Sequence, residues 1–256
     1  MSGGLAMTGL TVRLGERDVL RGVDALCPAG TVTAVIGPNG AGKSTLLRAI
    51  VGLLPASGSI AFGGADLGPM SRRARARLVA YLPQGHEVHW PLPARDIVAL
   101  GRMPHGGQDP DRLSPADVER VEAAMAETEI LHLADRPVSA LSGGERARVA
   151  LARVFAADAP VLLADEPVAA LDPRHQLDVA GALRRRAEAG VVVVVVTHDL
   201  GLAARIADRV LVLRDGRVAA AGPSDVALAP AILSDVFGVT AFRAEHEGRP
   251  VIVPWA

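Results

Sequence analysis

The stretch GPNGAGKST at residues 37–45 combines the residue types that hold a phosphate group. Lys43 supplies a compact charge for the β and γ phosphates, and the Ser44 hydroxyl can ligate Mg²⁺. Three glycines let the backbone approach the anion, with successive N–H groups pointing at it. The stretch matches GxxxxGK[ST], which predicts a nucleotide-binding loop. Its candidate contacts are Gly37, Pro38, Asn39, Gly40, Ala41, Gly42, Lys43, Ser44 and Thr45.

Lys43 also stands out by composition. The chain has 27 basic residues, and Lys43 is the only lysine among them. An ammonium on a flexible stem cannot be replaced everywhere by a planar guanidinium. The single lysine therefore marks a site that needs the shape of an ammonium group. The alternative is that its position is due to chance.

Two adjacent carboxylates follow a short apolar stretch, VLLA at 161–164. Asp165 is the better candidate for holding Mg²⁺, directly or through water. Glu166 is the better candidate for a general base that aligns the attacking water. A capped turn before Pro167 is the alternative, but a phosphate loop earlier in the chain favours the catalytic interpretation.

A third motif, LSGGE at 141–145, precedes a stretch of helix-forming composition. Ser142 and Glu145 have the spacing of a capping box, which predicts Ser142 as the helix N-cap. Gly143 and Gly144 leave the first helical N–H groups uncovered, so this helix start is a second candidate anion site. An ordinary capped helix is the alternative.

The elements that must position these residues alternate between strands and helices. Apolar β-branched runs predict buried strands at 31–36, 161–164 and 191–196, and the first two end in the motifs described above. Ligands bind at the carboxyl ends of strands in open α/β sheets, so an α/β fold is expected.

Composition limits the class of protein. The chain has 256 residues, 50% of them hydrophobic and 3% aromatic, so its core is aliphatic. A net charge of −1 argues against a disordered polyelectrolyte and a basic nucleic-acid binder, and no nucleic-acid partner is expected. One cysteine, Cys27, excludes an internal disulfide. The valine run at 191–196 is far short of the ~20 residues of a membrane span. No export signal is evident at the start, so a reducing, cytoplasmic setting is expected.

Taken in their order along the chain, the motifs resemble those of the ATP-binding-cassette (ABC) ATPases over nearly the whole sequence. The series is completed by YLPQ ending at Gln84, ALD at 170–172 and THD at 197–199. The resemblance implies a P-loop α/β core with a mixed sheet and flanking helices, at 1–84 and 158–256, and an inserted α-helical subdomain at 85–157 that carries the signature motif. It also implies a head-to-tail homodimer in which Ser142, Gly143 and Gly144 act in trans, since each motif occurs once.

Further residues gain roles from the same resemblance. His198 is similar to the family's switch histidine at the γ-phosphate. Gln84 resembles the residue that approaches Mg²⁺ and links core to subdomain, and Asp172 resembles one that crosses the dimer interface. Leu14 stands where the family usually has an aromatic that stacks on adenine, so adenine stacking is not expected there.

Two segments point to a transported substrate. Residues 83–107, including DIVALGRMPH, resemble the part of metal-chelate importers that meets the membrane partner, and 240–253 resembles their closing hairpin of two short strands. His86, His89 and His105 are expected to be solvated surface residues rather than metal ligands. Arg72, Arg73, Arg75 and Arg77 are expected on the solvated face of a helix that runs toward Tyr81. Ser114, followed by Pro115, is expected to start a further helix in the inserted subdomain.

The resemblance thus implies an ATP- and Mg²⁺-dependent ATPase that energises an importer of haem, iron siderophore or cobalamin. Its expected partners are two transmembrane permease subunits and, indirectly, a periplasmic or surface substrate-binding protein. Its expected location is peripheral, on the cytoplasmic side of the inner (plasma) membrane. The alternatives are a soluble ABC ATPase in cofactor assembly, such as iron–sulfur cluster assembly, and an ATPase for another transported substrate. A DNA-handling ABC ATPase is disfavoured because no sustained heptad pattern is present.

Overall fold

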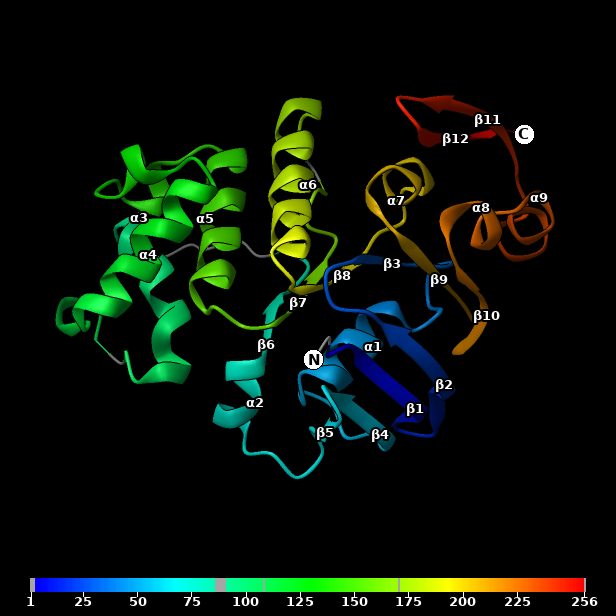
Figure 1. Cartoon of the computed structure of the whole chain (residues 1–256), viewed down its shortest axis with the longest axis horizontal. Helices are drawn as coiled ribbons and strands as arrows, with labels where there is room; N and C mark the ends of the chain where they lie inside the picture. Colours follow the sequence, from blue (N-terminus) through cyan, green and yellow to red (C-terminus); the bar gives the residue numbers. More distant parts are fainter. Residues whose placement is uncertain (1–2, 86–90, 108, 170, 256) are drawn as a thin grey trace. The chain divides into compact units, whose positions relative to one another are not determined.

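A computed structural model describes residues 3–85, 91–107, 109–169 and 171–255 (Figure 1). The chain forms two compact units. Unit 1 comprises Met1–Met70 and Arg186–Ala256, and unit 2 comprises Ser71–Arg185. The subdivision into 1–84 with 158–256 and 85–157 stays a prediction. No helix among the described residues is both long enough and apolar enough to pass through a bilayer.

Unit 1 contains two groups of strands. An antiparallel sheet has the order β2-β1-β4-β5, and a second group of neighbouring strands has the order β10-β9-β3-β8. In the second group β3 pairs in parallel with both β8 and β9. The bounds are β1 Leu5–Leu14, β2 Arg17–Cys27, β3 Val32–Ile36, β4 Ser57–Phe62, β5 Ala65–Asp66, β8 Val192–Val196, β9 Arg209–Arg214 and β10 Arg217–Gly222.

Two neighbouring strands of that group, β3 and β8, are buried at every residue. Both are apolar and rich in β-branched residues, as expected for parallel strands covered on both faces. They agree with the strands predicted at 31–36 and 191–196, except that each begins one residue later. Because β3 and β8 are parallel neighbours, the segments that follow them leave the same edge of the sheet.

The helices of unit 1 are α1 Lys43–Ile50, α7 Leu200–Ile206, α8 Ser224–Ala227 and α9 Pro230–Ile232, followed by a π-helical turn at Leu233–Phe237. The chain then forms the predicted hairpin, β11 Thr240–His246 and β12 Arg249–Trp255, which extends two residues beyond the expected end. The buried Ile252 lies on β12, which packs against α7.

Unit 2 combines a pair of parallel strands with helices. The strands are β6 Val79–Leu82 and β7 Val161–Asp165. The helices are α2 Arg72–Leu78, α3 Ala94–Ala99, α4 Pro115–Glu127, α5 Gly143–Ala156 and α6 Pro173–Glu188, the last of which runs into unit 1; short 3₁₀ segments are Leu100–His105, Pro110–Arg112, Leu131–Leu133 and Val138–Ala140. Helices α3, α4 and α5 pack on one another and are drawn in green in Figure 1.

Two sequence expectations in unit 2 can be compared directly. Ser114 caps α4, as its position before a proline predicts. The helix that begins at Arg72 stops at Leu78, short of Tyr81, which lies in β6. The run Val-Ala-Tyr-Leu pairs in register with β7, so strand pairing ends the helix.

Candidate functional site

The phosphate loop connects β3 to α1, the strand–loop–helix context that its pattern requires. Lys43 is the first residue of α1, and only 9% of it is exposed. Its Nζ donates to the carbonyl oxygen of Gly37 at 2.7 Å and to that of Pro38 at 3.1 Å. The loop therefore wraps around the ammonium group, which places the positive charge inside the ring of backbone that it forms.

Glycine is required at two positions of this loop. Gly37 has φ 152°, and a Cβ there would lie 2.1 Å from the carbonyl oxygen of Leu213 in β9. Gly42, the N-cap of α1, has a left-handed backbone with φ 102°, and its Cβ would lie 2.6 Å from Leu20 Cδ2. At Gly37, glycine is required because a side chain would clash with β9 of the same protein. A Cβ on Gly40, in contrast, would enter open space.

His198 follows β8 at the sheet edge from which the phosphate loop leaves β3, and it is exposed. The residues on either side of it, Thr197 and Asp199, are held by local hydrogen bonds. Asp199 caps α7 by accepting from the Leu202 amide at 3.0 Å, and the Thr197 hydroxyl accepts from the Asp199 amide at 3.1 Å. Unit 1 thus places two of the predicted motifs on neighbouring strand ends.

Unit 2 has a comparable edge where β6 and β7 end. Leu82 pairs with Ala164, so Gln84 and the two carboxylates follow neighbouring parallel strands. Asp165 is fully buried, and the Tyr81 hydroxyl donates to its Oδ2 at 3.4 Å. Gln84 lies in an exposed turn.

Glu166 follows Asp165 with an unusual backbone. It is 7% exposed and has φ 52°, in the left-handed region that non-glycine residues rarely adopt. Backbone strain of this kind gathers at functional sites. The backbone strain therefore agrees with the functional role that the sequence predicts for the Glu166 carboxylate.

The signature motif opens α5 as predicted. Ser142 is the N-cap, its hydroxyl accepts from the Glu145 amide at 3.3 Å, and the Ser142 amide donates to Glu145 Oε2 at 2.7 Å. The capping box is therefore confirmed. The hydrogen bond from the Ser142 backbone is the main reason that the pKa of Glu145 is lowered. A Cβ on Gly143 would meet open space, so the start of the helix is accessible there.

His175 is a neighbour of the signature motif that the sequence did not reveal. Its ring carbons and Nδ1 lie 3.0–3.2 Å from where a Cβ on Gly144 would stand. The same ring pairs with Asp172, Nδ1 to Oδ2 at 2.7 Å, and Asp172 also accepts from the His175 amide at 3.0 Å. Hydrogen bonds from His175 lower the pKa of Asp172. Unit 2 thus brings two predicted site residues, Asp172 and Gly144, together through a histidine between them.

The remaining expectations fall outside such clusters. Leu14 ends β1 and is 42% exposed. His86, His89 and Ala170 lie outside the described residues. His105 was expected to be a solvated surface residue, and this is wrong, because its ring contacts the carbonyl oxygen of Ala157 at 2.9 Å and is half-buried. Within the described part of the chain, no three His, Cys, Asp or Glu side chains gather as metal ligands would.

Comparison with known proteins places the chain in a family. The family described as "ABC transporter" matches residues 20–169, which include the phosphate loop, the signature motif and both carboxylates. The chain belongs to this family, and it is an ATP-binding and ATP-hydrolysing protein with the fold of an ABC ATPase.

Individual relatives show which members of the ABC transporter family the chain is similar to. The chain is 49% identical over 252 residues to a protein of Streptomyces coelicolor named "Hemin import ATP-binding protein HmuV", covering 97% of this chain and 89% of that protein. A protein of Pseudomonas putida with the same name is 42% identical, covering 97% of this chain and 99% of the relative. Among solved structures, an ABC transporter described as of metal-chelate type and inward-facing has a TM-score of 0.84 and 25% identity, covering 99% and 98% of the two chains.

Proposed function

We propose that this chain is the ATPase subunit of an ABC importer for a metal chelate, with haem as the first candidate. The observation that carries the proposal is the 49% identity to a hemin import ATP-binding protein over 97% of the chain. Two features of the chain agree with it: the DIVALGRMPH segment and the C-terminal hairpin.

The proposed roles follow the positions of the residues in each unit. Residues 37–45 bind the phosphates of ATP, with Lys43 as the cation. His198, at the neighbouring strand end, contacts the γ-phosphate. Glu166 is the general base that orients and polarises the attacking water. Single copies of the motifs support a homodimer, in which Ser142, Gly143, Gly144 and Asp172 contact the site of the other subunit.

The proposed metal is Mg²⁺. Its ligands in proteins are hard oxygens, and this chain offers the Ser44 hydroxyl, the Gln84 side chain and the Asp165 carboxylate. The buried Asp165 fits this role because its carboxylate stands at the end of a strand, where the Tyr81 hydroxyl donates to its Oδ2 at 3.4 Å. When bound, the metal neutralises charge on the β and γ phosphates.

The proposed partners are two membrane-spanning permease subunits, on which the dimer docks from the cytoplasmic side, and indirectly a substrate-binding protein. ATP binding closes the dimer and hydrolysis reopens it, so that motion is the useful output. The substrate itself passes through the permease, so this chain has no need of a haem site.

The function is tested by purifying the tagged chain with its membrane partners and reconstituting the complex in lipid nanodiscs. We expect ATPase activity that rises when haem-loaded binding protein is added, with cyanocobalamin and a ferric siderophore as controls. Stimulation by one of the controls alone would change the substrate within the chelate group. Recovery of the chain only with soluble proteins would instead favour an ATPase of cofactor assembly.

The homodimer is tested with the purified chain alone. Turnover per subunit should fall as the protein is diluted, because each site needs two subunits. Turnover that stays constant down to strictly monomeric protein, measured by sedimentation in parallel, would contradict the shared site.

A further inference from the structure

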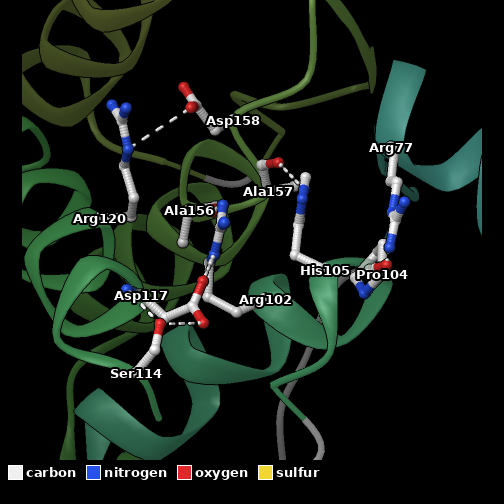
Figure 2. Close-up of polar contacts among 10 residues, drawn as sticks. All are labelled: Arg77, Arg102, Pro104, His105, Ser114, Asp117, Arg120, Ala156, Ala157 and Asp158. Atoms are coloured by element: carbon white, nitrogen blue, oxygen red, sulfur yellow. Dashed lines mark hydrogen bonds and ion pairs between the residues drawn. The ribbon is translucent and has the colours of Figure 1, made fainter.

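The last carbonyl groups of α5 have partners from a segment more than 50 positions earlier in the chain. Arg102 Nη1 donates to the carbonyl oxygen of Ala156 at 2.7 Å, and His105 Nε2 lies 2.9 Å from that of Ala157 (Figure 2). A carbonyl oxygen only accepts, so Nε2 carries the hydrogen. The final carbonyls of a helix have no partner within it, and cations are favoured there. The two side chains therefore cap the C-terminal end of α5.

Arg102 is itself held in place. It is 7% exposed, and its Nε donates to Asp117 Oδ1 at 2.7 Å. The other oxygen of Asp117 accepts from the Ser114 hydroxyl at 2.7 Å, and Ser114 is the N-cap of α4. The hydroxyl of Ser114 and the guanidinium of Arg102 lower the pKa of Asp117, so the carboxylate stays charged. One buried arginine thus joins the start of α4 to the end of α5.

The backbone of the same segment makes further close contacts. A Cβ on Gly101 would lie 2.2 Å from the carbonyl oxygen of Arg153, so glycine lets the segment lie directly against α5. The carbonyl oxygen of Pro104 accepts from Arg73 Nε at 3.0 Å and from Arg77 Nε at 2.8 Å. Residues 101–105, GRMPH, therefore contact three helices, α2, α4 and α5.

We infer that GRMPH is a clamp on the C-terminal end of α5 that sets the position of the signature motif at its other end, with Arg102 as a positioning residue for ATP hydrolysis. This rests on the proposed function, in which Ser142, Gly143 and Gly144 contact the nucleotide of the second subunit. The helix has 14 residues, which at 1.5 Å per residue makes it about 21 Å long. A tilt of roughly 5° at the clamp would move the signature by about 2 Å, and a displacement of about 1 Å can cost ~100-fold in rate.

The clamp also gives the DIVALGRMPH segment a function. The sequence suggested a surface that meets the membrane partner. The structure turns Arg102 and His105 of that segment inward, onto α5, and ties its backbone to α2. A partner that contacts this segment or α2 would therefore act on the signature motif through the clamp.

The test compares three variants of the full chain. Arg102→Met removes both hydrogen bonds of the guanidinium, and Arg102→Lys keeps the charge while reaching one acceptor at most. Arg120→Met is the matched control, because Arg120 lies on α4 and pairs with Asp158 just beyond α5 at 3.5 Å, but is 59% exposed. All measurements are made well below the Tm of the least stable variant.

We expect Arg102→Met to lower kcat about 10-fold or more while the KM for ATP and ATP binding by the monomer change less than about twofold. In a Glu166→Gln background, ATP-driven dimer formation should weaken by a similar factor, and hydrogen exchange at the amides of 143–146 should become faster. Arg102→Lys should recover part of each effect, and Arg120→Met should match the parent.

Two results would overturn the clamp while leaving the proposed function intact. One is a soluble Arg102→Met variant with the kcat, dimer formation and exchange of the parent. The other is a loss of activity that only follows the loss of folded protein in circular dichroism. If Arg102→Met does not fold, Asp117→Asn replaces it, with the same readouts. The proposed function fails if the parent chain does not hydrolyse ATP and its Glu166→Gln variant does not dimerise when ATP is added. This inference then fails with it.

Discussion

The two helices whose N-termini carry the glycine-rich motifs begin in different ways. Helix α5 starts with a complete capping box, in which Ser142 and Glu145 satisfy each other's amides. Helix α1 starts at a left-handed glycine, Gly42, with no side-chain cap hydrogen bond, and its first residue is the buried Lys43. The start of α5 is therefore ordered by its own side chains. The start of α1 is built around a cation instead, which suits a terminus completed by a bound phosphate.

The largest expected effect separates ATP binding from hydrolysis. Glu166→Gln should lower the rate of hydrolysis about 10²- to 10⁴-fold, the range for removing a general base, while ATP still binds. Hydrogen exchange on this variant then tests the two helix starts. Amides at 40–45 should gain protection as soon as ATP binds, and those at 143–146 only when the dimer forms. Normal turnover would remove Glu166 from the role of base.

The second effect concerns the cation of α1. Lys43→Ala should weaken ATP binding by about 3 kcal/mol, or roughly 100-fold, because a desolvated charge pair with the phosphates is lost. Titration with a fluorescent ATP analogue measures this. Arg48→Ala is the control, because Arg48 is an exposed cation on the same helix. An unaltered affinity in Lys43→Ala would refute the assignment of the phosphate loop.

A smaller effect is expected at the cap of α5. Ser142→Ala should lower the free energy of unfolding by about 1 kcal/mol, the usual cost of losing a serine N-cap. Urea unfolding without nucleotide measures it, with Ser139→Ala, an exposed serine just before the motif, as the control. If the two variants were equally stable, the start of α5 would not be ordered by its cap.

The smallest effect is a dependence on pH. The pKa of Glu145 is lowered in the folded chain, first by the Ser142 amide, so its carboxylate stabilises the fold at pH values above the unfolded pKa of about 4.3. That contribution is lost as the pH falls through the lower, folded pKa. Urea midpoints between pH 7 and pH 3 should therefore drop less steeply for Glu145→Gln than for the parent, and parallel curves would contradict the capping box.

Local patterns in the sequence were enough to predict the strand before the phosphate loop, the cap at Ser142, the cap at Ser114 and the final hairpin. Each of these depends on residues within a few positions of one another. Spacing, turn chemistry and alternation therefore carry the information. The ABC ATPase fold was implied by the resemblance of the motifs, in their order along the chain, to that family.

Contacts between distant segments could not be predicted in this way. His175 lies against Gly144 because the first turn of α6 meets the start of α5, and no spacing within the sequence indicates this contact. The same holds for His105, predicted to be solvated, which reaches the carbonyl group of Ala157 across 52 positions. The helix that stops at Leu78 is a related case, because the pairing of residues 79–82 with the distant strand β7 ends it.

The left-handed backbone at Glu166 has a consequence for protein engineering. Such a conformation costs a non-glycine residue about 1–3 kcal/mol, so a sequence optimised for this backbone alone would place glycine or asparagine there. Glu166→Gly should then raise the melting temperature of a protein that no longer turns over. At this position the residue that favours thermal stability and the residue that favours catalysis are therefore different. The chain carries the glutamate, which is the residue that favours catalysis.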